Sequence, residues 1–193
     1  MPTPWIVSNI VLCVLVLVET ALLILLLRAL GRLRQEGGFS GGRVADRVSG
    51  GLPVGMQAPL IAGTDQQGRT VSLNDTKGRL RILAFISPGC AACARAISAL
   101  NTVLASNPDM PVLLVGSSDS AANRAYAAEH HLGIPLLTPR PGRGKEVYRV
   151  EGVPFVFVID GAGVIRAAGV VNGDEQMQRL LSMAQDAALV HSS

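Results

Sequence analysis

The chain has 193 residues, of which 49% are hydrophobic but only 4% aromatic, and its mean hydropathy is +0.38. A single soluble domain of this length is rarely so apolar, so some of the apolar residues serve a purpose other than a core. The same composition excludes collagen-like, coiled-coil and disulfide-rich secreted proteins.

The apolar excess lies near the N-terminus. After a stub of residues 1–4, residues 5–27 are apolar at 19 of 23 positions. A helix of that length measures about 34 Å, which is enough to span the hydrocarbon core of a bilayer. A secretory signal peptide has basic residues before the apolar run and a small-residue cleavage site after it, and neither is present here. We therefore expect residues 5–27 to be an uncleaved transmembrane helix in contact with membrane lipid.

Two side chains within the predicted anchor are unusual for a membrane helix. Glu19 lies deep in the span, where an ionisable group indicates a partner helix or a polar path. A protonated Glu19 tolerated beside Thr20 without a partner is the equally acceptable alternative. Cys13 is expected to be a small apolar filler.

A basic, glycine-rich tether is predicted at residues 28–51. Residues 28–50 hold five Arg against two acids, a net charge of +3, whereas residues 51–193 hold twelve bases and eleven acids. The pI of about 9.1 therefore reflects the tether, and the near-neutral domain is not expected to bind nucleic acid. By the positive-inside rule, arginines that follow the anchor favour a cytoplasmic domain.

Residues 52–193 are predicted to form one α/β domain with parallel strands joined to an antiparallel edge. Buried apolar runs indicate the strands, and apolar residues at helical spacing indicate the helices. In chain order, we expect a hairpin around 67–73, a strand at 80–86, a helix at 90–105, a strand at 111–115, a helix from 119 or 120 to about 132, a short helix around 145–149, a hairpin of 154–159 with 164–168, and a helix at 174–190.

Two of the three cysteines form the motif Cys90-Ala91-Ala92-Cys93 at the junction of a buried strand and a helix. Cys90 is predicted at the helix N-terminus, where unpaired N–H groups and the helix dipole favour a thiolate. Cys93 lies one turn later and can close a small disulfide. This placement predicts thiol–disulfide exchange in which Cys90 attacks and Cys93 resolves, with no cofactor beyond the Cys90–Cys93 disulfide.

Other readings of the cysteine pair are less favoured. A structural zinc site needs two further ligands, and the sequence has no second CxxC and no His-x-His pair. A c-type haem site needs a histidine where Ala94 stands. A purely structural disulfide at this spacing would be strained and add little stability, yet structural or vestigial cysteines remain the main alternative. We predict no metal ligand.

Five segments of the predicted domain together carry a family resemblance: VGMQAP at 54–59, DQQGRTVSL at 65–73, LRILAFISPGC at 80–90, PVLLVGSSD at 111–119 and GVPFVFVIDGAGVIRAAG at 152–169. Through them the sequence resembles the thioredoxin-like superfamily, and within it the membrane-anchored TlpA/MauD-type proteins. The resemblance implies a central mixed sheet flanked by helices and a cis bond before Pro154. It also implies that Val153 and Pro154 bind substrate beside the sulfurs, in an active-site loop that includes Ser87, Pro88, Gly89, Ala91 and Ala92.

This resemblance implies disulfide chemistry on protein thiols outside the cytoplasm, during maturation of methylamine dehydrogenase or another envelope protein. It places the domain on the outer side of the cytoplasmic membrane, against the positive-inside rule, and allows a redox partner within the membrane. The chain departs from the superfamily at two positions: Gly89 replaces an aromatic residue, and Ala84 replaces a buried acid that accepts the proton of the resolving thiol.

Two further resemblances give rival functions. Peroxiredoxins share the opening strand and hairpin, but their peroxidatic cysteine follows a Pro by seven residues and a Thr or Ser by three. Ser87 fits this pattern, whereas Leu83 does not. A thioredoxin-like metal-delivery module would need a distal histidine. His130 and His131 are expected at a helix C-terminus, where surface histidines are common, and His191 lies in the tail.

Overall fold

The computed structural model describes residues 15, 17, 19, 50–76, 78–117 and 119–190. The chain divides into two units, Met1–Arg43 and Val44–Ser193. In the first unit, Leu15, Leu17 and Glu19 are helical and exposed, whereas the rest of the predicted anchor, including Cys13, lies outside the described residues. The predicted stub, residues 28–49 of the predicted tether and His191 lie outside them too. No helix among the described residues is long and apolar enough to cross a membrane.

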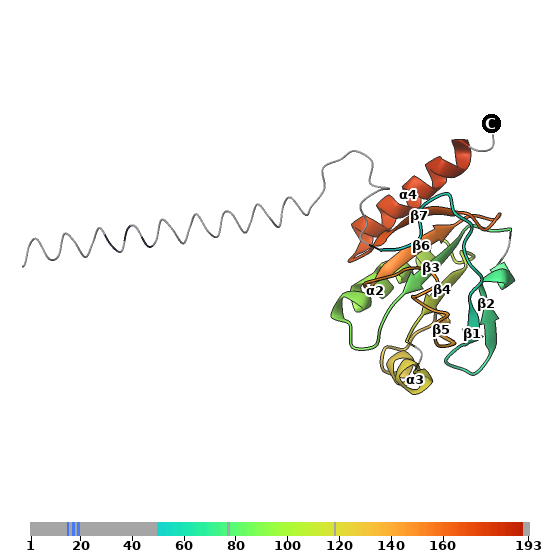
Figure 1. Cartoon of the computed structure of the whole chain (residues 1–193), viewed down its shortest axis with the longest axis horizontal. Coiled ribbons are helices and arrows are strands. Elements are labelled where there is room, and N and C mark those ends of the chain that lie inside the picture. The colour runs from blue at the N-terminus through green and yellow to red at the C-terminus, as the bar shows by residue number, and fades with distance from the viewer. Residues whose placement is uncertain are drawn as a thin grey trace, which may run out of the picture. The chain divides into compact units, whose positions relative to one another are not determined.

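The second unit is built on a mixed sheet in the strand order β2-β1-β5-β4-β3-β6-β7 (Figure 1). The central strands β3, β4 and β5 run parallel, and the other strands pair antiparallel with their neighbours. The predicted mixed sheet is therefore confirmed. The strands are β1 (Ala62–Thr64), β2 (Thr70–Ser72), β3 (Arg81–Phe85), β4 (Val112–Val115), β5 (Leu136–Pro139), β6 (Phe155–Ile159) and β7 (Ile165–Val170).

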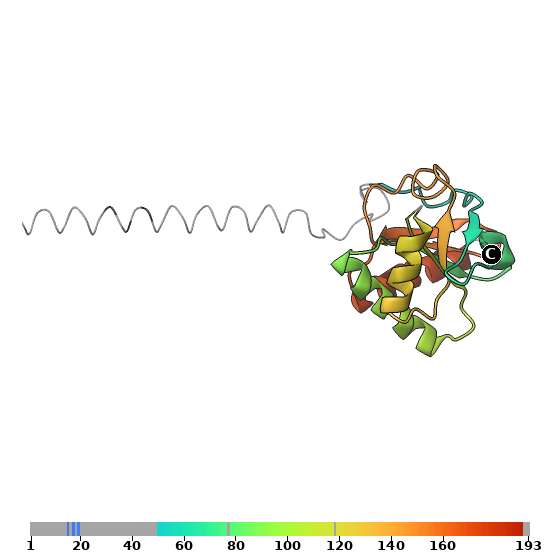
Figure 2. The same cartoon turned by 90° about the horizontal axis from the view of Figure 1, so that it is seen from below.

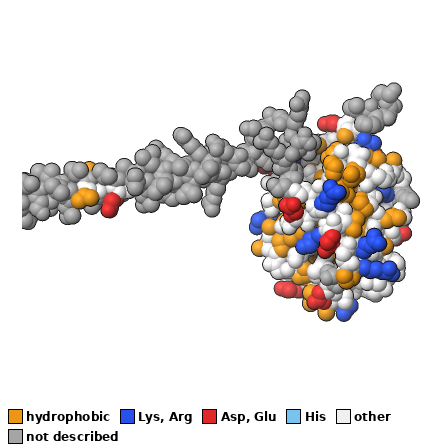
Figure 3. Space-filling model, viewed as in Figure 1, with side chains coloured by type: hydrophobic (Ala, Val, Ile, Leu, Met, Phe, Trp, Pro, Cys, Tyr) orange, Lys and Arg blue, Asp and Glu red, His pale blue; other side chains and the backbone are white. Residues whose placement is uncertain are grey.

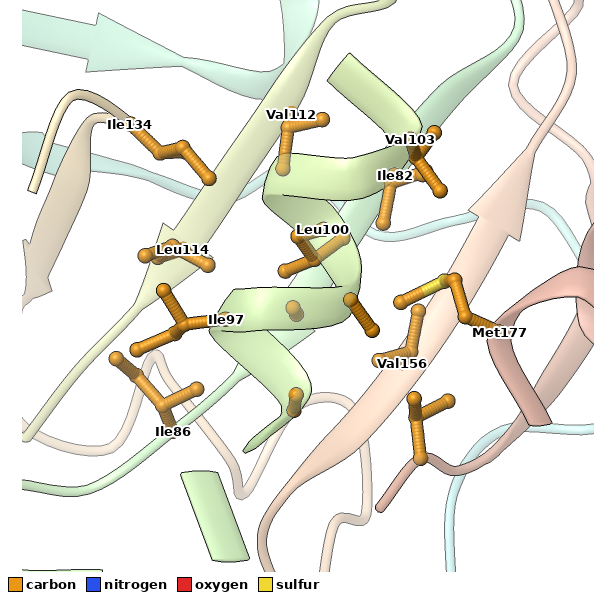
Figure 4. Packing of buried hydrophobic residues seen from close by; sticks show 14 of the residues in the cluster. Ile82, Ile86, Ile97, Leu100, Val103, Val112, Leu114, Ile134, Val156 and Met177 are labelled. Carbon is orange, nitrogen blue, oxygen red and sulfur yellow. The ribbon is translucent and has the colours of Figure 1, made fainter. Parts of the chain in front are cut away.

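Three helices pack against one face of the sheet, as Figures 1 and 2 show from two directions. They are α2 (Ala91–Ser106), α3 (Ser120–Glu129) and α4 (Asp174–Val190), and a short 3-10 helix, η2, covers Leu73–Thr76. The predicted apolar stripe of α2 lies in the core: Figure 4 shows Ile97, Leu100 and Val103 among side chains from β3, β4 and β6.

The opposite face of the sheet is covered by an aromatic cluster. Alternate residues of β3 point to opposite faces, so Leu83 and Phe85 enter this cluster while their neighbours contact α2. The Phe85 ring lies 5.2 Å from that of Tyr148 and 5.9 Å from that of Phe157. Because β3 is buried on both faces, its near-continuous apolar sequence is what a central strand requires.

Two of the predicted helices differ from the structure, and each has a residue in the left-handed conformation at its C-terminal end. The helix expected to reach about residue 132 ends at Glu129, and His131 follows with φ +47°. The short helix expected around 145–149 is a series of turns, in which Val150 N–H donates to Lys145 O at 2.9 Å. Arg149 has φ +53°, which is incompatible with continuing a right-handed helix.

The β1–β2 hairpin is held by Asp65, whose carboxylate is fully buried. Oδ1 accepts hydrogen bonds from the backbone N–H of Gln67 at 2.9 Å and of Arg69 at 2.8 Å, and Oδ2 accepts one from Arg69 Nε at 2.8 Å. Burial by itself would raise the pKa of Asp65, but these hydrogen bonds to the ionised form outweigh it and the pKa is lowered.

A carboxylate with a lowered pKa stabilises the folded state above its unfolded pKa of about 3.9 and loses that contribution as the pH falls. We expect Asp65→Asn to lower the free energy of unfolding by about 2 kcal/mol at pH 7. The loss should shrink as the pH falls from about 4 through the lowered pKa of Asp65, because wild-type Asp65 also becomes neutral there. Urea unfolding at pH 7 and at a pH below that lowered pKa checks this, with Asp186→Asn on the exposed surface of α4 as the control. A loss that is equal at both pH values would contradict it.

Candidate redox-active site

A tight turn links the end of β3 to the start of α2. Cys90 N–H donates to Ser87 O at 3.2 Å, which leaves Pro88 and Gly89 at the two central positions. Gly89 has φ +76°, and a type II turn requires a positive φ at this position while favouring proline before it. The turn therefore explains why glycine stands where thioredoxins carry an aromatic residue.

Cys90 is the N-cap of α2, as its predicted place at the helix start requires. Its backbone is extended, with φ −86° and ψ 105°, and its Sγ accepts a hydrogen bond from Cys93 N–H at 3.2 Å. That N–H belongs to the first turn of the helix and also donates to Cys90 O at 3.0 Å, so the sulfur and the carbonyl of the N-cap residue share it. The sulfur of Cys90 thus lies where a negative charge is stabilised by backbone dipoles.

Cys90 and Cys93 are joined by a disulfide, with their Cα atoms 5.3 Å apart. The two sulfurs differ in access, because Cys90 is half-buried whereas Cys93 has no exposed surface. An incoming thiol or disulfide can therefore reach Cys90 but not Cys93. The pair is arranged for one attacking and one internal sulfur.

The start of β6 lies beside the disulfide. Phe155 pairs with Phe85 in the antiparallel β3–β6 register, which brings the residues before β6 next to the residues after β3. The Val153–Pro154 bond is cis, as the resemblance implies. The carbonyl oxygen of Val153 lies 4.0 Å from Cys90 Sγ, across 63 residues of sequence. The chain thus presents a backbone acceptor beside the accessible sulfur.

Cys93 is surrounded by apolar side chains. It belongs to the cluster beneath the three helices, together with Ala84, and both residues have no exposed surface. Among the described residues, Asp65 is the only buried acid, and it lies in the β1–β2 hairpin. No buried acid beside Cys93 therefore takes the place of the one that the superfamily has at position 84, and the proton of a reduced Cys93 has to leave by way of water or the client.

The other predicted loop residues surround the disulfide. Ser87, Pro88 and Ala92 are half-buried, and Ala91 is exposed. One contact at this edge of the sheet has no signal in the sequence: Arg95 of α2 donates through Nε to Asn172 O at 3.3 Å, joining segments 77 residues apart. Glu19 belongs to the first unit of the chain.

The histidines considered for metal delivery lie away from the cysteines. The cysteines follow the C-terminal end of β3, and α3 begins after the C-terminal end of the parallel strand β4. Because α3 runs back along the sheet, His130 and His131 at its end lie near the N-terminal ends of these strands, away from the cysteines. The His130 ring packs against Tyr126, with centroids 4.4 Å apart. Within the described parts of the chain, no group of three or more His, Cys, Asp or Glu side chains is placed to hold a metal ion.

Comparison with known proteins gives the same class of chemistry. The methylamine utilization protein MauD of Paracoccus versutus is 27% identical over 176 residues, covering 91% of this chain and 87% of MauD. The thiol-disulfide oxidoreductase ResA of Bacillus thuringiensis subsp. konkukian is 23% identical over 117 residues, covering 59% of this chain and 68% of ResA.

The chain also resembles solved structures and matches a family profile. A proposed thiol:disulfide interchange protein DsbE from Chlorobium tepidum superposes with a TM-score of 0.63 at 22% identity, covering 70% of this chain and 98% of that one. This likeness confirms the predicted thioredoxin-like fold. The profile of the AhpC/TSA family matches residues 54–168, which is more than half of the chain. The chain therefore belongs to the AhpC/TSA family and is a thiol–disulfide oxidoreductase of thioredoxin-like fold.

Proposed function

We propose that this protein is a membrane-anchored oxidoreductase that exchanges disulfides with protein clients outside the cytoplasm. The observation that supports this proposal best is the disulfide of a half-buried Cys90 with a fully buried Cys93 at a helix N-terminus. Only one sulfur is open to a partner, and the other is held where it can break a bond to that sulfur. A two-step exchange needs this division of roles.

In the reduced protein, the Cys90 thiolate attacks one sulfur of a client disulfide. A bond forms between Cys90 Sγ and that sulfur, and the second client sulfur leaves as a thiolate that takes up a proton. The Cys93 thiolate then attacks Cys90 Sγ, which releases the first client sulfur and restores the Cys90–Cys93 disulfide. Two electrons pass from the protein to the client, and the same steps in reverse oxidise a client dithiol.

Val153 and Pro154 are proposed to bind the client backbone. Proline has no N–H, and the Val153 carbonyl lies beside Cys90 Sγ, so an extended client segment can donate a backbone hydrogen bond there. Binding through backbone atoms would align the client cysteine with Cys90 without requiring a particular side chain. Such a mode fits an enzyme that acts on proteins rather than on a small molecule.

The proposal includes a membrane anchor and a client in the cell envelope. Residues 5–27 would hold the domain near the outer surface of the cytoplasmic membrane, which raises its effective concentration toward clients that emerge there. Glu19 would then contact a partner helix, such as a redox partner in the membrane. The MauD relatives are methylamine utilization proteins by name, so maturation of methylamine dehydrogenase, or of another envelope protein, is the role we propose.

The roles of the two cysteines predict different reactivities after reduction. In a Cys13→Ser background, we expect Cys90 to be alkylated at least about tenfold faster than Cys93 at pH 7, because Cys90 is accessible and its thiolate is stabilised by the helix N-terminus. Mass spectrometry of the labelled peptides over a range of pH checks this. Equal rates for the two cysteines would show that the assignment of roles is wrong.

Removing the resolving sulfur should trap the client. In Cys93→Ser, the bond between Cys90 and the client has no internal route of release, so we expect a discrete protein adduct on non-reducing gels. The adduct should disappear on reduction and be absent from the matched control, Cys90→Ser. Its mass-spectrometric identification also tests the link to methylamine dehydrogenase.

The match to the AhpC/TSA profile makes a peroxidase the rival function. Against it, the position seven residues before Cys90 is Leu83, a buried residue in the middle of β3 rather than a proline. We expect the purified protein to consume no hydroperoxide. Hydroperoxide consumption that Cys90→Ser abolishes, together with the absence of any adduct in Cys93→Ser, would establish the peroxidase instead.

The proposed location also predicts an outcome in whole cells. In intact spheroplasts, we expect added protease to digest the domain while a cytoplasmic marker protein stays intact. The arginines after the anchor oppose this arrangement by the positive-inside rule, although they can also bind anionic lipid headgroups. A domain protected until the membrane is permeabilised would place it in the cytoplasm.

A further inference from the structure

A buried arginine lies at the end of β3 remote from the cysteines. Arg81 begins this strand, and only 4% of its surface is exposed. Buried arginines are nearly always paired with an acid, because a charge removed from water needs a partner. Among the described residues, however, Arg81 makes no ion pair, and its one side-chain hydrogen bond runs from Nη1 to Thr76 O at 2.7 Å.

The unused part of the guanidinium is the edge formed by Nε and Nη2. Nε is completely buried and has no hydrogen-bond partner in the described structure, and Nη2 makes no hydrogen bond there either. Because Nε has no accessible surface, a ligand oxygen can reach Nη2 but not Nε. A cationic N–H group of this kind is a donor to a carboxylate or phosphate oxygen.

A cavity of about 370 Å³ lies beside Arg81, lined also by Gln57, Asn74 and Gly163. Gly163 has φ +88°, and a Cβ built on it would lie 2.5 Å from Gln57 Nε2 and 3.4 Å from Arg81 Nη2. The amide of Gln57 and the guanidinium thus face the same glycine. Gln57 Nε2 donates one hydrogen bond, to Ala162 O at 3.0 Å, and its second N–H is available.

Asp160 is the carboxylate that acts electrostatically on Arg81, but it does not form an ion pair with it. Burial lowers the pKa of Arg81, while Tyr148 and Asp160 act in the opposite direction. The two oxygens of Asp160 are already engaged, one with Val164 N–H at 2.8 Å and the other with Arg166 Nε at 2.7 Å. On the face that Figure 3 displays, Lys and Arg side chains lie among Asp and Glu side chains, whereas the buried Arg81 forms no ion pair with a described acid.

We propose that this cavity binds a small anionic ligand through a carboxylate or phosphate group held by Nη2 of Arg81, with Gln57 as an additional donor. The site lies at the N-terminal end of β3, and the disulfide follows the C-terminal end of the same strand. Five residues of strand separate them by about 17 Å, so the ligand does not take part in the disulfide chemistry.

Isothermal titration calorimetry with inorganic phosphate and, separately, with acetate tests the proposal on the purified full-length protein. Chloride keeps the ionic strength constant, because non-specific attraction to surface charges is screened equally in all samples. We expect saturable binding of one anion per chain, and the tighter of the two probes identifies the preferred group. Arg81→Gln should weaken the affinity by about tenfold or more, since it removes both the positive charge and the Nη2 donor.

Two further variants separate the site from general effects. Arg79→Gln removes the same charge from an exposed arginine that contacts Asp109 O, and it should leave the affinity unchanged. Asn74→Asp places a carboxylate of nearly the same shape in the cavity wall, and it should weaken binding by competing for Arg81 even if Arg81→Gln fails to fold. No saturable binding of either probe, or an affinity that Asn74→Asp does not change, would overturn the proposal.

Discussion

The antiparallel pairing of β3 with β6 is the constraint on which the rest of the structure depends. Five residues of β3 pair with five of β6, from Arg81 with Ile159 to Phe85 with Phe155. Both strands are buried on both faces, between the helices on one side and the aromatic cluster on the other. A shift of this register by one residue would turn every one of these side chains toward the wrong core, so burial holds the pairing in place.

The redox site follows from this pairing. Because β3 ends opposite the start of β6, the turn that leads to Cys90 and the cis bond that precedes Pro154 must lie side by side. The helix then starts at Ala91 with the Cys90 sulfur as its cap. Thiolate stabilisation thus comes from backbone groups, which every sequence has, rather than from charged side chains. Backbone stabilisation explains why the two residues between the cysteines, Ala91 and Ala92, need carry no charge.

The same strand connects two different kinds of polar site. At its C-terminal end the half-buried disulfide faces an incoming protein, and at its N-terminal end Arg81 faces a cavity. A central strand with apolar side chains between its ends keeps these two sites separate. The rigid core between them means that each site is positioned by packing and not by the other site.

Much of the fold was determined by local sequence patterns. The strand at 80–86, the helix after Cys90 and the helix at 174–190 agree with the structure to within one or two residues, because apolar periodicity and the Pro88-Gly89 turn are local signals. The same local signals placed Cys90 at a helix start and Cys93 one turn inside it. The cysteine chemistry was therefore evident before any tertiary contact was known.

Other features were decided only by tertiary structure. β5 has four residues and is a strand because it pairs with β4 and β1, which no local pattern indicates. The turns at 145–149 replace a helix because Tyr148 is buried against Phe85 and its hydroxyl donates to Pro59 O at 2.6 Å. The contact of Val153 O with Cys90 and the burial of Arg81 likewise depend on residues far apart in the chain. Periodicity reports which face of an element is apolar, but the partner of that face is selected by long-range packing, and so the sequence determined the chemistry of the cysteines while the fold decided what surrounds them.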